Sequence, residues 1–315
     1  MTDERAAILR TLLAGMPQTL AVVDRVIEVW PEHARYLIAS FKPRSQNILA
    51  ATEEAATAAR ALMAGGDAQF AADYRWTCER LREEEIYFHR NERYRLSTFA
   101  EANSEVYSNI QYMGRYVNGL LLSQLLWYNH AATLEMFLNR VLGTFSQPFD
   151  YLEVGPGHGL MVFFAARSAL SRALEAWDVS AVSLRETRAA LTRLAVPKPV
   201  TLSLADISSA PTSAKTFDLV VISEVLEHLE APGEALCFLR GALSDHGRMF
   251  INVPLNSPSP DHIYLLSNPD EVISLVEGAN LRVESIELFA TQATEIPRAV
   301  ANKVSISAGI IAVAA

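Results

Sequence analysis

The sequence predicts an α/β fold, with a mostly parallel β-sheet preceded by a region made of helices alone. Three observations lead to this prediction. Residues 1–146 carry apolar side chains at helical spacings and almost no strand pattern. After residue 146, apolar strand patterns alternate with helical patterns, which is typical of βαβ units. The last two strand patterns have no long helix between them, which predicts an antiparallel pair at the sheet edge.

The first region is predicted from its apolar periodicity and its breaks. Apolar side chains recur every three or four residues, as on the buried face of a helix. Gly65-Gly66 interrupts this pattern once, which marks a turn. The predicted helices are 6–16, 20–30, 51–63, about 68–88, about 97–117 and about 119–142.

The second region is predicted to alternate strands and helices up to a final strand pair. Asn268 is a good N-cap, with Pro269 at the first helical position and Glu271 able to complete a capping box. This predicts a helix from Asn268 to about residue 277. The predicted strands are 149–154, 174–179, 200–205, 217–223, 247–253, 281–289 and 302–314, with further helices over 161–170, 182–194 and 232–243.

Composition and charge exclude several classes of protein. Half of the 315 residues are hydrophobic, and 27 Lys and Arg against 36 Asp and Glu give a net charge of −9. Such a surface repels the nucleic-acid backbone, so no nucleic-acid partner is expected. The N-terminus carries acids where a signal peptide carries basic residues. The apolar run 119–127 is shorter than the roughly 20 residues of a membrane span. We therefore expect a cytoplasmic protein with no membrane partner.

A glycine-rich segment, LEVGPGHG (152–159), follows the first strand of the second region. Glycines there let the backbone turn tightly and approach a ligand, while the next helix presents free N–H groups. Taken alone, such a loop is a weak signal, and a plain strand-to-helix turn is the alternative. A dinucleotide fingerprint expects Gly or Ala at the last position of G-x-G-x-x-G, where this chain has Leu160. The loop therefore argues against an NAD site.

Acidic residues stand at the ends of the next two strands. Asp178 ends the second strand, where a carboxylate can accept the hydroxyls of a ribose. Asp206 ends the third strand, where it can accept the amino group of an adenine. Each residue taken alone is equally well explained as a helix N-cap. Ligands of open parallel sheets bind at the carboxyl ends of the strands, so the joint placement favours a nucleotide-like ligand.

From Tyr151 to about Gly278, the sequence resembles the class I S-adenosylmethionine-dependent methyltransferases. The resemblance implies a Rossmann-like seven-stranded sheet with the order 3-2-1-4-5-7-6. It implies a methyltransferase domain over 147–315 that binds S-adenosylmethionine and releases S-adenosylhomocysteine. We expect residues 1–146 to form a helical domain for substrate covering or oligomerisation. The resemblance lies in LEVGPGHG, WDVSAVSL, Ala205-Asp206-Ile207, FDLVVISEVLEHLEAPGEAL and RGALSDHGRMFINVP.

The resemblance also implies roles for individual residues. Asp178 would hold the ribose with Val179 against the adenine, which Asp206 and Ile207 would flank. The methionine part would lie among the residues of the glycine loop, and the sulfonium beside the end of the fourth strand. The residues implied for these last two places are Glu153, Gly155, Gly157 and Gly159, and Ser223 and Glu224.

Two histidines are candidate general bases. His228 occupies a position that often faces the active site in this family, and His262 follows the fifth strand, where a substrate-facing loop is expected. For either histidine a structural role is an equal alternative. Cys78 and Cys237 have no Cys or His neighbour at metal-ligand spacing, so no metal site is expected.

The segment 105–131 carries many polar and aromatic side chains for a predicted buried helix, so it is the candidate substrate cover. Ordinary aromatic packing is an equal alternative. Arg115 is a candidate partner for a substrate carboxylate, although a solvated Arg is the default. This helix also resembles, more weakly, natural-product O-methyltransferases that esterify carboxylates of peptides. The candidate substrate residues are Tyr112, Arg115, Tyr116, Trp127, Tyr128 and His130.

The sequence thus favours a methyltransferase that transfers a methyl group to an oxygen of a small molecule or modified peptide. A carboxylate acceptor leads because it is already ionised near pH 7 and needs no base. A phenol or amine acceptor, and a non-catalytic methyltransferase-like partner protein, are the alternatives. A homodimer through the helical domain is a further expectation.

Overall fold

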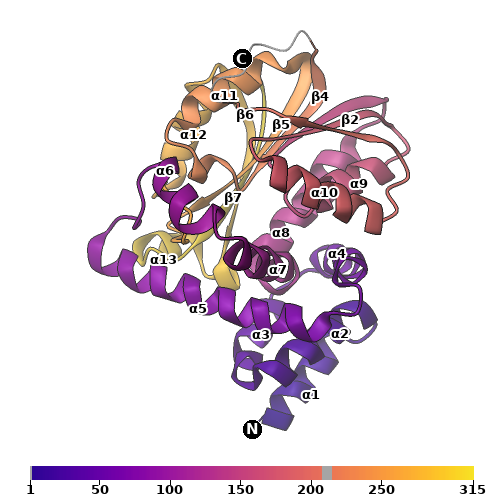
Figure 1. Cartoon of the computed structure of the whole chain (residues 1–315), viewed down its shortest axis with the longest axis vertical. Coiled ribbons are helices and arrows are strands. Elements are labelled where there is room, and N and C mark those ends of the chain that lie inside the picture. Colours follow the sequence, from indigo (N-terminus) through magenta and orange to yellow (C-terminus); the bar gives the residue numbers. More distant parts are fainter. Residues whose placement is uncertain (1, 208–214) are drawn as a thin grey trace.

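The computed structural model describes residues 2–207 and 215–315, and Figure 1 shows their arrangement. Its seven-stranded sheet has the order β3-β2-β1-β4-β5-β7-β6, as the sequence predicts. β7 runs antiparallel to both of its neighbours, and the pairs from β3 to β5 are parallel. The strands are β1 (Phe149–Val154), β2 (Ser171–Asp178), β3 (Val200–Leu204), β4 (Phe217–Ser223), β5 (Leu243–Leu255), β6 (Leu281–Ala290) and β7 (Ile306–Ala314).

The sheet separates two apolar cores because side chains alternate between its faces along each strand. On β4, Leu219 and Val221 face one core, while Val220 and Ile222 face the other. Figure 1 shows α9 and α10 on one side of the sheet and α11 and α12 on the other. The helices of this region are α9 (Leu160–Arg167), α10 (Ala181–Arg193), η5 (Leu226–His228), α11 (Pro232–Gly241), α12 (Pro269–Glu277), η6 (Thr291–Ala293) and α13 (Ile296–Ala301).

The first region is helical throughout its described length and packs onto one face of the sheet. Leu37, Leu62 and Leu125 belong to the same buried cluster as Tyr151 and Leu219 of the sheet. Figure 1 shows α1–α5 gathered at the end of the molecule opposite α11. The helices are α1 (Thr2–Leu12), α2 (Pro17–Val29), η1 (Pro31–His33), α3 (Ala34–Phe41), α4 (Gln46–Met63), α5 (Asp67–Asn91), α6 (Phe99–Ala102), η2 (Asn103–Tyr107), α7 (Ile110–Leu126), α8 (Tyr128–Met136), η3 (Phe137–Val141) and η4 (Leu142–Thr144).

The helix boundaries predicted between residues 97 and 142 are wrong. The chain does not break near residue 118, because α7 runs through Gly119 without interruption. A Cβ at Gly119 would lie 2.1 Å from Oγ1 of Thr77, so this glycine allows α5 and α7 to cross closely. The breaks lie instead at Asn109, which caps α7 by accepting a hydrogen bond from the N–H of Tyr112, and at Trp127, which is extended.

Smaller differences concern elements whose boundaries depend on packing. The short helix α3 is not predicted from the sequence. The last strand starts at Ile306 and not at residue 302, because α13 occupies Ile296–Ala301. The predicted cap of α12 is confirmed, since the Asn268 side chain accepts a hydrogen bond from the N–H of Glu271 at 3.1 Å. In residues 2–207 and 215–315 no helix is long and apolar enough to cross a membrane.

Candidate functional site

The glycine loop makes a tight turn between β1 and α9. Gly155, Gly157 and Gly159 all have positive φ angles, of 67°, 48° and 76°. A Cβ at Gly155 would lie 2.6 Å from Cγ2 of Val225, so a side chain at this position would meet the segment after β4. The loop therefore holds bare backbone, and the N-terminus of α9, at the carboxyl edge of the central strands.

The two strand-end acids lie beside this loop because of the strand register. The N–H of Gly155 donates to the carbonyl of Trp177 at 2.8 Å, which places the loop next to the end of β2. Asp178 is the last residue of β2 and pairs in register with Leu204, the last residue of β3. Its Oδ1 accepts a hydrogen bond from the N–H of Ser180 at 2.8 Å, and burial raises its pKa.

The surroundings of Asp178 and Asp206 fit a ligand with a hydroxylated ring and an aromatic base. A carboxylate has about four lone-pair positions, so Asp178 can accept hydroxyl hydrogens in addition to its bonds from the N–H of Ser180 and the side chain of Ser183. The side chain of Val179 is 56 % exposed, whereas Ile207 is buried. These residues therefore combine polar and apolar surface at one edge of the sheet, as the adenosine part of S-adenosylmethionine requires.

Glu153 lies in β1 directly before the glycine loop and is buried. The hydroxyl of Tyr151 donates to its Oε2 at 2.8 Å. Burial raises the pKa of Glu153 to about 8, because the charged form loses its hydration. The carboxyl group therefore already has an internal partner, and most of its population is protonated at pH 7.

The end of β4 is held by the neighbouring strand β5. The side-chain amide of Asn252 donates to Oγ of Ser223 at 3.0 Å and to Oε1 of Glu224 at 2.8 Å. Glu224 has a positive φ of 54°, and burial raises its pKa to about 7. The sequence singles out Ser223 and Glu224 but not Asn252, since only strand pairing brings this amide beside them.

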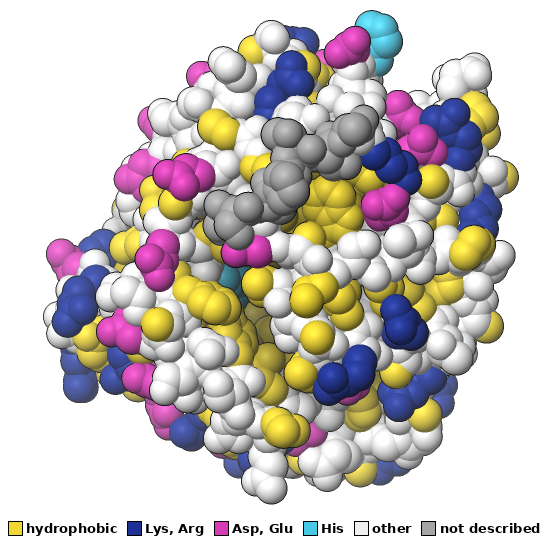
Figure 2. All heavy atoms as spheres, turned by 45° about the horizontal axis from the view of Figure 1, so that its top comes forward, with side chains coloured by type: hydrophobic (Ala, Val, Ile, Leu, Met, Phe, Trp, Pro, Cys, Tyr) yellow, Lys and Arg dark blue, Asp and Glu magenta, His cyan; other side chains and the backbone are white. Residues whose placement is uncertain are grey.

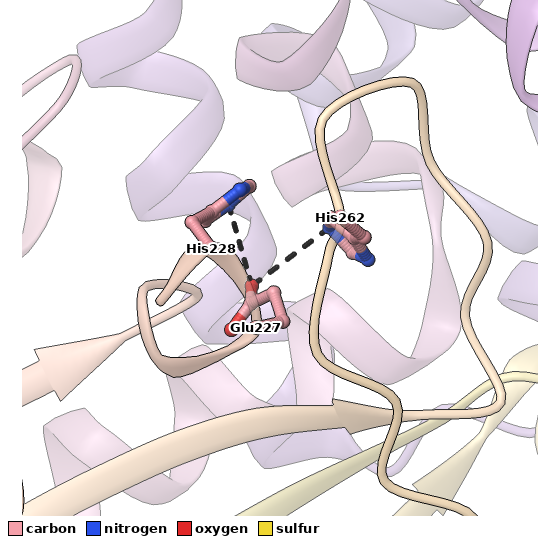
Figure 3. Close-up of side chains that lie close together, drawn as sticks. All are labelled: Glu227, His228 and His262. Carbon is pink, nitrogen blue, oxygen red and sulfur yellow. Dashed lines mark ion pairs between the residues drawn. The ribbon is translucent and has the colours of Figure 1, made fainter. Parts of the chain in front are cut away.

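Both predicted histidines lie around a buried carboxyl group that the sequence analysis does not single out. Glu227 and His228 belong to η5 after β4, and His262 lies in the segment after β5 (Figure 3). Oε1 of Glu227 lies 3.7 Å from Nε2 of His228 and 3.9 Å from Nε2 of His262. Glu227 is 0 % exposed, and neither of its carboxylate oxygens has a hydrogen-bond partner in the described part of the chain.

The two imidazole rings are held by their other nitrogens. Nδ1 of His228 donates to the carbonyl of Asp261 at 3.0 Å, and Nδ1 of His262 donates to the carbonyl of Ser257 at 2.6 Å. Since a carbonyl only accepts, the bonded Nδ1 atoms carry the hydrogens. Burial lowers the pKa of His262 to about 4, so this ring is neutral at pH 7.

The helical region contributes two tyrosines to the same place. The hydroxyl of Tyr116 donates to Oδ1 of Asp261 at 3.0 Å, and that of Tyr107 donates to Oδ2 at 3.3 Å. Burial and the charges of Asp261, Glu227 and Asp178 raise the pKa of Tyr107. Asp178, at the end of β2, therefore acts electrostatically on Tyr107. Tyr107 is a residue that the sequence analysis does not single out.

The other predicted substrate residues have partners within the helical region. Arg115 donates to Oδ1 of buried Asp73 at 3.0 Å, and its guanidinium lies over the ring of Trp76. The ring of Tyr112 packs edge-on against Trp76. Arg115 therefore has an ion-pair partner already, and its role as a carboxylate ligand stays a prediction.

The last three predicted substrate residues lie around the break between α7 and α8. Nε1 of Trp127 donates to the hydroxyl of Tyr74 at 2.9 Å, and the Trp127 ring packs on His130. Burial, with a smaller effect of His158 in the glycine loop, lowers the pKa of His130 to about 4. Tyr128 is half-buried beside the same break. Of the six predicted substrate residues, Tyr116 is the one whose side chain is hydrogen-bonded to the carboxylate of Asp261.

Figure 2 shows a hollow on the face of the molecule seen there, with largely hydrophobic walls and a histidine side chain inside it. A hollow with apolar walls and few polar groups is the usual form of a small-molecule site. The cluster described above, in which carboxyl, imidazole and phenol groups lie close together among apolar side chains, is consistent with such a site.

The family comparison identifies the class of the protein. The model of a methyltransferase domain family matches residues 126–286, which is more than half of the chain. The chain therefore belongs to this methyltransferase domain family, whose cofactor is S-adenosylmethionine. A comparison with curated proteins gave no match.

Solved structures with a similar fold share little sequence identity with the chain. The [4+2]-cyclase SpnF is 16 % identical, with a TM-score of 0.48, covering 59 % of this chain and 81 % of its own. A methyltransferase from Aquifex aeolicus that depends on S-adenosylmethionine is 17 % identical, with a TM-score of 0.42 and coverages of 55 % and 88 %. An S-adenosylmethionine-dependent methyltransferase from Clostridium acetobutylicum is 11 % identical, with a TM-score of 0.41. The match covers 53 % of this chain and 84 % of that protein's chain.

Proposed function

We propose that the protein transfers the methyl group of S-adenosylmethionine to an oxygen atom of a small molecule or a modified natural-product peptide. One observation carries this proposal. The glycine loop, which lies next to the end of β2 and Asp178, closely approaches Val225. Val225 directly precedes η5, which carries Glu227 and His228 beside His262. A cofactor edge next to such groups suits a transferase that acts on a polar atom, because they can orient the acceptor and take up a proton where it carries one.

In this proposal the cofactor lies along the carboxyl ends of β1, β2 and β3. Asp178 accepts the ribose hydroxyls, and Val179 and Ile207 pack on the adenine with Asp206 at its edge. The sulfonium lies beside Ser223 and Glu224. The glycine loop supports this placement, since its positive φ angles favour glycine, and glycines offer the methionine part bare backbone. Glu153, two residues before Gly155, is held in place by its hydrogen bond from Tyr151 and so helps to position the start of the loop.

When bound, S-adenosylmethionine supplies an already activated methyl group, so the protein mainly has to align the acceptor and exclude water. Alignment of two reactants contributes about 7–11 kcal/mol, whereas a general base contributes about 10²–10⁴-fold in rate. His228 is the better-placed base, because its side chain is 22 % exposed while that of His262 is 8 % exposed. His262 then acts mainly by holding the loop after β5.

A carboxylate is the first class of acceptor to test, because an ionised oxygen needs no base. A phenol is the second, and a specific observation favours it. Glu227 and Asp261 are buried at this site with half-buried Glu224 beside them, and these carboxyl groups disfavour a further negative charge unless they are protonated or neutralised. A neutral hydroxyl that gives its proton to His228 avoids this cost.

We also propose that residues 1–146 form a domain that covers the acceptor, while residues 147–315 hold the cofactor. The bonds from Tyr107 and Tyr116 to Asp261 support a covering role, since they tie the helical region to the loop after β5. Self-association through the helical domain is part of this proposal. The side chain of Ile110 is 85 % exposed, which gives α7 an apolar position for a second copy.

The test is incubation with S-adenosylmethionine labelled in its methyl group and a panel of carboxylic acids and phenols. Transfer of label to an organic product supports the proposal. Alkali then separates the two acceptor classes, because methyl esters release labelled methanol and aryl methyl ethers do not. Saturable cofactor binding without transfer to any acceptor, in a panel that includes peptides, would instead support a non-catalytic partner protein.

A further inference from the structure

Three lone-pair acceptors face one another where Glu227, His228 and His262 meet. One ligand atom from each of the three side chains lies within 4.8 Å of the other two, and Nε2 of each histidine is the nitrogen nearest to Oε1 of Glu227. Figure 3 shows both rings turned toward the carboxyl group from two different segments of the chain. Groups that only accept hydrogen bonds repel when they face each other, so this arrangement needs protons or a cation between them.

The hydrogen bonds of the rings leave the Nε2 atoms free to act as ligands. The Nδ1–H groups of His228 and His262 are directed to the backbone carbonyls of Asp261 and Ser257. Metal-binding histidines commonly have this arrangement, in which one nitrogen donates to a carbonyl and the other binds the metal. The backbone of the loop after β5 therefore favours the tautomer required for binding at both rings, and at His228 the Tyr107 hydroxyl, 3.1 Å from Nδ1, is a second partner of the same nitrogen.

The distances fit a bound ion better than a set of hydrogen bonds. The separations of 3.7 and 3.9 Å from Oε1 of Glu227 to the two Nε2 atoms exceed hydrogen-bond length. Ligands that are each about 2.1 Å from one ion lie roughly 3.0–4.2 Å apart, depending on the angle between them. Both measured separations fall within this range.

The buried carboxyl group provides a second and independent observation. Glu227 is 0 % exposed, yet both of its oxygens are without a hydrogen-bond partner across the described residues. Buried polar atoms in native structures are nearly always bonded, and an exception calls for an ion or another ligand. The unbonded oxygen that faces the two rings is therefore the third ligand of the set.

We infer that Glu227, His228 and His262 form a binding site for a divalent transition-metal cation such as Zn²⁺, Co²⁺, Fe²⁺ or Mn²⁺. Two imidazoles and one carboxylate are a donor set that these ions accept, whereas Mg²⁺ and Ca²⁺ prefer oxygen donors alone. Three protein ligands leave at least one coordination position for an oxygen of another molecule.

With the cation bound, Nε2 of His228 is a ligand and no longer a free base, so in the loaded site the cation, in place of this base, receives the acceptor oxygen. Its charge offsets those of Glu227, Glu224 and Asp261, so that an ionised oxygen can approach the methyl donor. This use of the cation rests on the methyltransferase function proposed above, whereas binding of the cation itself does not. The sequence analysis expects no metal site, because the ligands come from two segments and none of them is a cysteine.

The experiment is a titration of the tag-free, metal-stripped full-length protein with Zn²⁺ by calorimetry and with Co²⁺ by visible absorption. We expect one saturable site per chain, and Co²⁺ bands typical of nitrogen coordination. Glu227→Gln and His262→Asn should each weaken binding at least about tenfold, since even loss of a residue that supports a metal ligand costs 10–100-fold. Glu277→Gln and His246→Asn, which change exposed residues of the same types, are the matched controls and should bind as the unchanged protein does.

Parallel titration with S-adenosylmethionine separates this inference from the proposed function. Cofactor binding without a saturable Zn²⁺ or Co²⁺ site would overturn the cation site and leave the methyltransferase standing. A cation site without cofactor binding would leave the cation site standing and overturn the proposed methyltransferase function. Equal Zn²⁺ affinity in all four variants would show adventitious binding and also overturn the inference. Far-ultraviolet circular dichroism shows which variants fold. If His262→Asn does not fold, Glu227→Gln serves as the test, because it keeps the shape of the side chain.

Discussion

The hydroxyl of Tyr116 donates a hydrogen bond of 3.0 Å to Oδ1 of Asp261, which joins helix α7 to the loop after β5. Asp261 also presents its backbone carbonyl to Nδ1 of His228. Helix α7 of the first region and His228 of the second region are therefore connected through a single residue. In the proposed function, this connection lets the helical region position what binds at the sheet edge.

Tyr116→Phe tests this connection. The variant removes a buried bond to a carboxylate, and such bonds contribute about 1.5–3 kcal/mol. We expect a loss of that size in the free energy of unfolding, measured by urea denaturation, and a higher KM for the methyl acceptor. Tyr112→Phe is the control, since the half-buried Tyr112 packs by its ring against Trp76. Equal stability of the two variants would contradict the role given to Tyr116.

Gly155→Ala tests the requirement for bare backbone in the glycine loop. The new Cβ would lie 2.6 Å from Val225 at a φ of 67°, and left-handed strain alone costs about 1–3 kcal/mol. We expect lower thermal stability and loss of saturable S-adenosylmethionine binding in calorimetry. Gly241→Ala, in α11 with no atom near its Cβ, should leave cofactor binding unchanged. Normal cofactor affinity in Gly155→Ala would count against the loop as a cofactor site.

Asp178→Ala tests the ribose contact. Loss of a charged acceptor for hydroxyl groups costs about 1.5–3 kcal/mol per bond, which corresponds to a 10-fold or greater loss of affinity. We expect the dissociation constant of S-adenosylmethionine to rise by at least this factor in calorimetry. Asp245→Ala, an exposed aspartate at the start of β5, should show no change. An unaltered affinity in Asp178→Ala would remove the ribose role.

Glu153 makes the stability of the protein depend on pH. Burial raises its folded-state pKa to about 8, above the 4.5 of an exposed Glu, so the folded state holds the proton more tightly than the unfolded state. This contribution is complete below pH 4.5 and is lost as the pH rises through about 8. Between pH 7 and 8 the buried histidines with pKa values of about 4 do not titrate.

Glu153→Gln isolates this effect. We expect unfolding free energies between pH 7 and 8 to fall less steeply in Glu153→Gln than in the unchanged protein, by on the order of 1 kcal/mol per pH unit at most. Urea denaturation at pH 7.0, 7.5 and 8.0 measures both slopes. Parallel slopes would mean that Glu153 is ionised in the folded protein in this range.

The sheet could be predicted from the sequence because local patterns define its strands. Apolar runs such as 217–223 and the capped start at Asn268 depend on nearby residues alone. The break at Trp127 could not be predicted in the same way, since its indole is bonded to Tyr74, far away in the sequence. The break predicted near residue 118 is wrong because α7 continues through Gly119, whose missing side chain allows a close contact with Thr77.

The candidate site was predictable only in part for the same reason. The glycine loop and Asp178 form a local pattern at strand ends. Glu227 became informative only in the structure, because its importance depends on two rings that approach it and on oxygens that lack partners. His228 and His262 were both found as candidates from the sequence, but their contact with one carboxyl group depends on how the loop after β5 folds.

Calorimetric titration of the metal-stripped and the Zn²⁺-loaded protein with S-adenosylmethionine, with NAD titrated in parallel, tests the central claim most directly. The account predicts saturable binding of S-adenosylmethionine at one site per chain, and no binding of NAD. Saturable binding of NAD, or no binding of S-adenosylmethionine in either form of the protein, would contradict it.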